Sequence, residues 1–198
     1  MKTIPFLRII AVITFMLQGS GAIAELRSGE YLSLYIPDSK NYSQAWRNYD
    51  TKSDFLVVEY LPKGQTTGNW REMVSLSVDY RNISGSVKSF AKRFLDENLR
   101  QCGGNRGQIL KTGRANGYPY ALIFYSCPKT PETGKPEWGL MIAFKGRESF
   151  YTGFKHWRQK PDNAAISEWR KIIGKAYVCD TRRPNHPCKD EFDEVFSK

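Results

Sequence analysis

The chain has 198 residues, a formal net charge of +10, four cysteines and two histidines. A chain of this length is an ordinary size for one domain with a real hydrophobic core. After residue 24 no stretch approaches the roughly 20 apolar residues of a membrane-spanning helix, which excludes a helical membrane protein for the rest of the chain.

Residues 1–24 have the three parts of a secretory signal peptide. Lys2 and Arg8 form a positive start, residues 9–17 are apolar, and small residues precede a cleavage point after Ala24. An uncleaved membrane anchor is the alternative, which the short apolar run disfavours. We expect residues 25–198 to form a single periplasmic or secreted domain. Cleavage removes two positive charges and leaves a net charge of +8, which is still basic.

The first half of the mature chain predicts three strands and one helix. Apolar and polar residues alternate in 31–36 and 73–80, residues 55–61 are an apolar strand, and residues 38–54 are polar and loop-like. Apolar residues then recur at helical spacing from Val87 to Cys102. Ser84 or Ser86 can cap this helix, and Gly103-Gly104 ends it.

The second half predicts four strands, over 108–112, 118–127, 138–145 and 148–157, and a last helix over 163–178. Asn116-Gly117 and Gly146-Arg147 stand where hairpin turns are expected. Connections this short favour neighbouring antiparallel strands. The fold class that we expect is α+β, a mostly antiparallel sheet of about six strands with two helices packed on it.

Four cysteines in an exported chain predict two disulfides, with three possible pairings. We prefer Cys102 with Cys127 and Cys179 with Cys188, because the segment between the second two contains two prolines and suits a tight return. Zinc bound by Cys179, Cys188 and His186 is the alternative. Its spacing matches no standard zinc motif, so we expect no metal site.

The sequence contains no recognisable catalytic or cofactor motif, neither G-x-S-x-G nor H-E-x-x-H. His156 lies in an aromatic-rich strand, which favours a packed position over a general base. His186 is expected in a surface turn. A hydrolase with an unrecognised site, using Glu59, Asp79 or His156, remains an alternative, and no cofactor is expected.

Two segments are candidates for contact with a ligand or partner. Asn69 and Trp70 follow a polar loop, where an amide beside an aromatic wall suits a ligand groove, although Trp70 as a cover over the sheet edge is the simpler interpretation. Tyr151, Lys155 and Trp157 belong to a hairpin that mixes basic and aromatic residues. That mixture is typical of single-stranded nucleic acid sites, but export makes an envelope protein or another anionic ligand the expected partner.

Two segments also carry a resemblance. Residues 59–73 (EYLPKGQTTGNWREM) and 116–137, together with the ending Val178-Cys179-Asp180-Thr181-Arg182, resemble a group of small exported proteins of Gram-negative bacteria with no assigned activity. The resemblance covers residues 55–188. The order of elements also looks like the PsbP-like fold, which would imply an accessory or binding role.

From these features we expect a non-enzymatic exported binding or accessory protein. The alternatives are the envelope hydrolase and a secreted virulence or toxin-neutralising protein. Sequence cannot separate the second of these alternatives from the binding or accessory protein.

Overall fold

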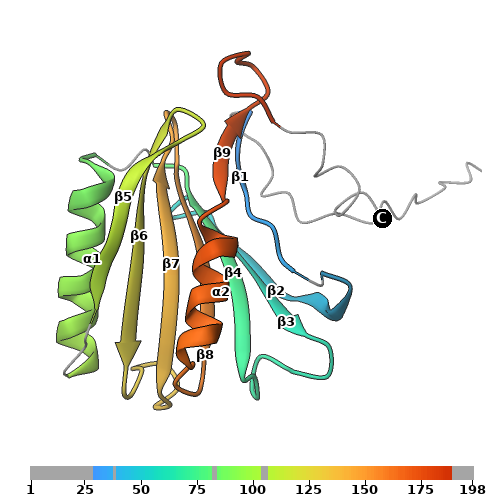
Figure 1. The fold of residues 1–198 in the computed structure, drawn as a ribbon, viewed down its shortest axis with the longest axis vertical. Coiled ribbons are helices and arrows are strands. Elements are labelled where there is room, and N and C mark those ends of the chain that lie inside the picture. The colour runs from blue at the N-terminus through green and yellow to red at the C-terminus, as the bar shows by residue number, and fades with distance from the viewer. Residues whose placement is uncertain (1–28, 38, 82–83, 104–106, 189–198) are drawn as a thin grey trace, which may run out of the picture.

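The computed structural model describes residues 29–37, 39–81, 84–103 and 107–188 (Figure 1). The predicted signal peptide lies outside the described residues. The elements in chain order are β1 (Glu30–Ser33), the short 3-10 helix η1 (Ser39–Asn41), β2 (Tyr42–Asp50), β3 (Phe55–Pro62), β4 (Glu72–Asp79), α1 (Val87–Cys102), β5 (Gln108–Ala115), β6 (Tyr118–Cys127), β7 (Glu137–Lys145), β8 (Phe150–Trp157), α2 (Asn163–Ile173) and β9 (Tyr177–Asp180).

Seven strands form one antiparallel sheet in the order β2-β3-β4-β8-β7-β6-β5, and β1 pairs with β9 in a separate two-stranded ribbon. The α+β class with an antiparallel sheet and two helices is therefore confirmed, although the sheet has seven strands rather than about six. Among the residues that the structure describes, no helix is both long and apolar enough to cross a membrane.

Three predictions for individual segments were wrong. Residues 38–54 contain β2, an edge strand with almost all of its side chains exposed, so no alternation of apolar residues marks it. Of the segment 31–36, only residues up to Ser33 are in a strand, and that strand pairs outside the main sheet. The last helix ends at Ile173 rather than residue 178, because Val178 is fully buried in the β1–β9 ribbon.

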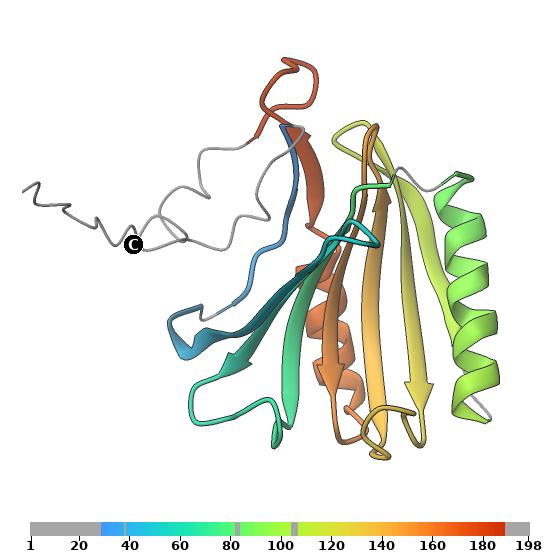
Figure 2. The same cartoon turned by 180° about the vertical axis from the view of Figure 1, so that it is seen from behind.

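The helices lie on opposite sides of the sheet, as Figures 1 and 2 show from front and back. Because neighbouring side chains in a strand point to opposite sides, β7 sends Leu140 and Ile142 toward α2 and Met141 toward α1. The β1–β9 ribbon shares the α2 side, where Val178 joins the main core. On the α1 side, a smaller core forms where Ala91 of α1 meets Met141 and its neighbours.

Helix α1 has the predicted bounds, and its ends explain them. The hydroxyl of Ser86 accepts a hydrogen bond from the Ser89 backbone N–H, and the Ser89 hydroxyl accepts one from the Ser86 N–H. This reciprocal cap satisfies two backbone donors that the helix leaves free. Gly103 ends the helix in the left-handed conformation (φ 58°), which glycine adopts without steric cost.

Both expected disulfides are present. Cys102, in the last turn of α1, is bonded to Cys127 at the end of β6, so this bridge ties the helix to the sheet. Cys179 of β9 is bonded to Cys188, and this bridge joins residues nine positions apart. The described part of the chain holds no free cysteine.

Tyr60 of β3 predicts a specific response to alkaline pH. Its side chain is buried on the α2 side, and its hydroxyl has no hydrogen-bond partner among the described residues. Burial raises the pKa of Tyr60 from 10 to about 12. A raised pKa means that the folded state holds the proton more tightly than the unfolded state, so this stabilisation is complete below pH 10 and is lost as the pH rises toward 12.

We therefore expect Tyr60→Phe to lose less stability than wild type between these two pH values. At pH 7 the variant should be at least as stable, because it removes an unpaired buried hydroxyl and keeps the ring. Urea unfolding at pH 7, 9 and 11 measures both effects. Parallel pH profiles of the two proteins would contradict the assignment to Tyr60.

Candidate functional site: a buried polar cluster under Trp70

A group of polar side chains lies on the α1 side of the sheet, where an apolar surface would be expected. Strand pairing places Ser75 of β4 opposite Phe154 of β8, and His156 of β8 opposite Gly139 of β7. Residues paired in this way project to the same side of the sheet. We use the name polar cluster for the residues that meet there, which are Ser75, Tyr125, Glu137, His156 and Arg158.

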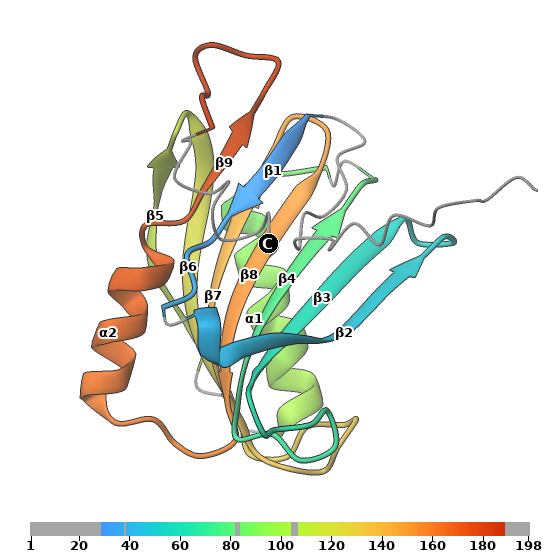
Figure 3. The same cartoon turned by 90° about the vertical axis from the view of Figure 1, so that its right-hand side faces the viewer.

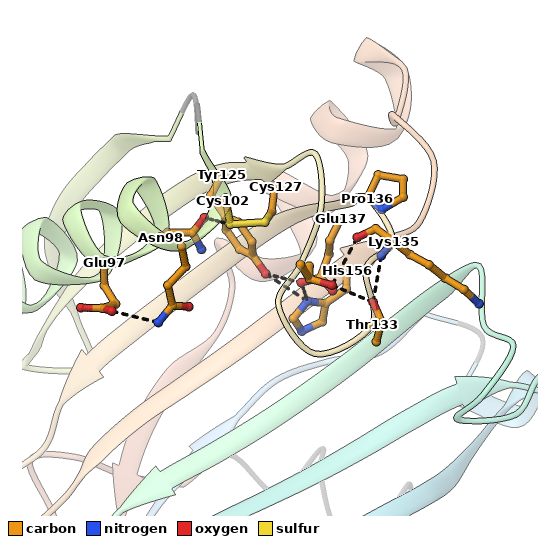
Figure 4. Close-up of a disulfide and its surroundings, with 12 residues drawn as sticks. Glu97, Asn98, Cys102, Tyr125, Cys127, Thr133, Lys135, Pro136, Glu137 and His156 are labelled. Carbon is orange, nitrogen blue, oxygen red and sulfur yellow. Dashed lines mark hydrogen bonds and ion pairs between the residues drawn. A yellow bond between two sulfur atoms is a disulfide. The ribbon is translucent and has the colours of Figure 1, made fainter.

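His156 is the centre of the polar cluster, and both of its ring nitrogens have partners. Its Nε2 lies 2.9 Å from Ser75 Oγ, and its Nδ1 lies 3.1 Å from Glu137 Oε1 and 3.1 Å from Tyr125 Oη. The hydroxyl of Tyr125 also donates to Glu137 Oε1, at 2.8 Å. Figure 4 shows Tyr125, Glu137 and His156 pointing toward one another beside the Cys102–Cys127 bridge.

The protons in this network follow from the chemistry of Glu137. Burial by itself raises the pKa of this carboxyl group, but hydrogen bonds from His156 and Tyr125 and the charge of Arg158 outweigh it, so the pKa lies below its usual value. An ionised carboxylate can only accept hydrogen bonds. Nδ1 of His156 therefore carries a hydrogen, and Nε2 shares a hydrogen bond with the Ser75 hydroxyl.

A missing side chain on β7 lets Tyr125 reach the cluster. A Cβ atom built on Gly139 would lie 2.1 Å from Cε1 of the Tyr125 ring, far inside van der Waals contact. The ring therefore crosses β7 directly above the Gly139 backbone. Phe94 of α1 packs against the Tyr125 ring at 5.3 Å between centroids, which holds it in this position.

Trp70 covers the outer side of the polar cluster. Its ring lies over the Arg158 guanidinium, with 3.8 Å between the ring centroid and Cζ, and meets the His156 ring edge-on at 6.3 Å. Trp70 as a cover is thus seen in the structure, although it covers the cluster rather than a bare sheet edge. The neighbouring Asn69 is exposed, and its backbone N–H donates to the carbonyl of Thr66 in the same loop.

The cluster is closed to solvent rather than open like a typical active site. Ser75 is 6% exposed and His156 is 8% exposed. Glu59 of β3, which pairs with Ser75, is the half-buried neighbour, and burial raises the pKa of Glu59 against the opposing influence of His156. Asp79 lies elsewhere, at the far end of β4, where Arg81 binds it with two hydrogen bonds from its guanidinium.

The second group of sequence candidates lies on the α2 side and is buried. Tyr151, Lys155 and Trp157 are 1%, 0% and 8% exposed. The Lys155 ammonium group donates to Glu72 at 2.5 Å and to the Tyr42 hydroxyl at 3.1 Å, and it lies 4.3 Å from the centroid of the Trp169 ring. Because these three side chains are buried, the structure does not support their contact with a partner. The predicted contact with a ligand or partner stays a prediction.

Sequence reasoning missed Ser75, Tyr125 and Glu137 as members of a site. The alternation in residues 73–80 predicts a half-buried strand with Ser75 and Ser77 on its polar side. Both serines are in fact buried, and Ser77 shares a hydrogen bond with Thr152. A serine in a strand gives the same sequence pattern whether its side of the sheet is buried or exposed, because packing against other elements decides whether it is covered.

One part of the α1 side has no helix over it. Within the described residues, α1 packs on β5, β6, β7 and the aromatic side chains of β8, while β2 and β3 extend beyond it, as Figure 3 shows from the side. Four of the side chains that project from these two strands on the α1 side are Trp46, Asn48, Val57 and Glu59. We call these four residues the open half-face. Trp46 is a large aromatic side chain and is 42% exposed.

No family model and no curated protein sequence matches this chain. Among solved structures it is similar to cyanobacterial PsbP (CyanoP) from Synechocystis sp. PCC 6803, with 13% identity over 67% of this chain and 91% of that one, and a TM-score of 0.42. The Ran-binding protein Mog1p of Saccharomyces cerevisiae has 8% identity, coverage of 76% and 92%, and a TM-score of 0.45. LpqN of Mycobacterium tuberculosis, a protein involved in cell envelope biogenesis, has 10% identity, coverage of 75% and 83%, and a TM-score of 0.41.

CyanoP is the type of structure that the expected PsbP-like order of elements pointed to. Similarity at these scores carries no argument about activity, ligand or partner, which must come from the residues of this chain.

Proposed function

We propose that this protein works outside the cytoplasm as a non-enzymatic accessory protein, and that it binds an envelope protein through the open half-face. The compartment is supported by two disulfides, which persist in oxidising surroundings, and by the predicted signal peptide. Binding is supported by one observation above all, the exposed Trp46 on the α1 side of β2 and β3, which no helix covers within the described residues. Tryptophan is enriched among the residues that contribute most to protein interfaces.

The open half-face has the composition of an interface rather than of an ordinary solvated surface. Trp46 lies opposite Glu59, and Asn48 lies opposite Val57, so apolar and polar groups alternate over two strands. Such a mixture, with an aromatic anchor and groups that can form hydrogen bonds, is typical of non-obligate complexes. Strand β2 also ends the sheet, so its outer backbone edge is available for pairing.

Site-specific photo-crosslinking in the periplasm tests this proposal. A photoreactive residue at Asn48 should give one discrete adduct, and the same residue at Lys111, exposed on the opposite edge strand β5, should not. Trp46→Ala should abolish the Asn48 adduct, since an anchor of this kind contributes about 2 kcal/mol or more to binding. Equal labelling at both positions, or no adduct at either, would refute it.

A hydrolase is the second candidate, because Ser75, His156 and Glu137 are hydrogen-bonded in the order that a serine nucleophile, a general base and an orienting carboxylate require. In a hydrolase, Ser75 Oγ would attack an ester carbonyl while Nε2 takes its proton. Two observations disfavour it. Ser75 is buried, and it lies in a strand paired on both sides, so its backbone N–H belongs to the sheet and cannot stabilise an oxyanion.

Labelling with a fluorophosphonate probe separates the two functions. We expect no covalent adduct on Ser75 of the folded protein. A hydrolase would instead show an adduct that Ser75→Ala removes and Ser77→Ala keeps. Ser77 is a matched control, since it lies on the same side of β4 and its hydroxyl also has a buried partner.

A further inference from the structure

A cavity of about 500 Å³ lies between the turn that joins β7 to β8 and the loop that the Cys179–Cys188 bridge closes. Its polar lining consists of Arg147 and Glu148 from the turn and Arg182, Arg183, Asn185 and His186 from the loop. The volume is within the usual range for small-molecule sites. None of these residues belongs to the open half-face or to the polar cluster.

Both walls of this cavity are held in place by buried carboxylates. Glu30, which is 2% exposed, accepts hydrogen bonds from the backbone N–H groups of Arg147 and Glu148 at 3.0 and 3.3 Å. Asp180, which is 1% exposed, accepts hydrogen bonds from the backbone N–H and the guanidinium of Arg182 at 2.9 to 3.0 Å. The lining is therefore positioned before any ligand arrives, which lowers the entropy cost of binding.

Two of the three arginines have terminal guanidinium nitrogens without a partner among the described residues. Arg182 instead commits Nε and both terminal nitrogens to Asp180 and Glu148, the latter at 3.1 Å. The guanidinium of Arg183 contacts Asp180 through Nε, at 3.4 Å, and its two terminal nitrogens have no partner in the part of the chain that the structure describes. The exposed guanidinium of Arg147 has no hydrogen bond or ion pair within the described residues. Arg147 and Arg183 thus approach the cavity from opposite walls with uncommitted planar donors.

His186 adds a third group aimed at the same space. Its Nδ1 lies 2.8 Å from the backbone carbonyl oxygen of Asn116, and its ring packs on Tyr118 with 4.8 Å between centroids. A carbonyl can only accept, so Nδ1 carries a hydrogen. Nε2 is therefore the nitrogen left for a ligand, as an acceptor in the neutral ring and a donor in the charged one.

We infer that this cavity is a binding site for a phosphate group, either free phosphate or the phosphate monoester of a larger molecule. Guanidinium groups match phosphate oxygens with two parallel hydrogen bonds, and a tetrahedral dianion can accept such pairs from two directions. Glu148 does not oppose this, since its carboxylate is paired with Arg182. The site is independent of the proposed protein contact.

Isothermal titration calorimetry with inorganic phosphate, and sedimentation with phosphatidylcholine vesicles that contain phosphatidic acid, test the two sources. We expect saturable binding in at least one assay and a loss of about tenfold or more in affinity, about 1.4 kcal/mol, for Arg147→Ala and for Arg183→Ala. Arg93→Ala is the matched control, because it removes the same charge from the exposed surface of α1. It should bind like wild type.

Binding to phosphate alone identifies a small soluble ligand, and binding only to vesicles identifies a lipid headgroup. Two results would overturn the inference. One is no saturable binding in either assay. The other is an equal loss for Arg93→Ala and Arg147→Ala, which would show attraction to the basic surface as a whole and not to this cavity.

Discussion

Replacing Gly139 with alanine should lower the free energy of unfolding by about 3 to 5 kcal/mol. The added Cβ would lie 2.1 to 2.6 Å from three atoms of Tyr125. That side chain cannot withdraw easily, because it is buried, packed against Phe94 and hydrogen-bonded to Glu137. Moving it would break the polar cluster and leave a buried carboxylate and His156 short of a partner. Urea unfolding followed by tryptophan fluorescence measures the change.

Gly68→Ala is the control for this substitution. No heavy atom lies within 4 Å of a Cβ built at that position, so we expect a change within about 0.5 kcal/mol. Tyr125→Phe separates the hydroxyl from the ring, and it should cost about 1 to 3 kcal/mol because the ring stays in place and only the hydrogen bonds are lost. If Gly139→Ala proved as stable as wild type, the close approach of the Tyr125 ring to β7 would be wrong.

Loss of the Cys102–Cys127 bridge should have the second large effect. The bridge joins residues 25 positions apart, for which the chain-entropy model gives a stabilisation of about 3.5 kcal/mol. It is also the only disulfide between α1 and the sheet in the described part of the chain. We expect the double variant Cys102→Ala/Cys127→Ala to unfold at a much lower urea concentration, with α1 exchanging its amide hydrogens first.

The Cys179–Cys188 bridge supplies the matched comparison. Its separation of nine residues predicts about 2.6 kcal/mol, and its removal should loosen residues 180–187, which the bridge encloses, while sparing α1. Hydrogen exchange read at individual segments distinguishes the two variants. Equal losses of protection in α1 for both would contradict the assignment of Cys102–Cys127 as the anchor of that helix.

The expected and observed elements differ most where a residue's surroundings come from distant parts of the chain. Helix α1 was predictable to the residue, because its apolar spacing, its cap and its final glycine are all local. Strand β2 was not, since an exposed edge strand has no buried side to produce alternation. The end of α2 was misplaced because Ala176 continues the apolar spacing of Ile173, whereas the chain has already left the helix to pair Val178 with Leu32 of β1.

The disulfide pairing could be predicted because the segment between Cys179 and Cys188 is short and contains two prolines, which favours a bridge between these two cysteines. The polar cluster could not. His156 was visible as one of two histidines, but Ser75, Tyr125 and Glu137 come from three different strands. Only the register that places Ser75 and His156 on one side of the sheet, and the gap at Gly139, bring them together.

Local sequence patterns were sufficient to predict the α+β class, the preferred disulfide pairing and the bounds of α1, because periodicity, caps and cysteine spacing act over short stretches of chain. Packing of the folded chain sets which polar residues are buried, encloses Lys155 in aromatic rings and places Arg147 across a cavity from Arg183. The physical reason is the same in each case. Burial and proximity depend on strand register and packing, and these join residues whose separation along the chain carries no signal.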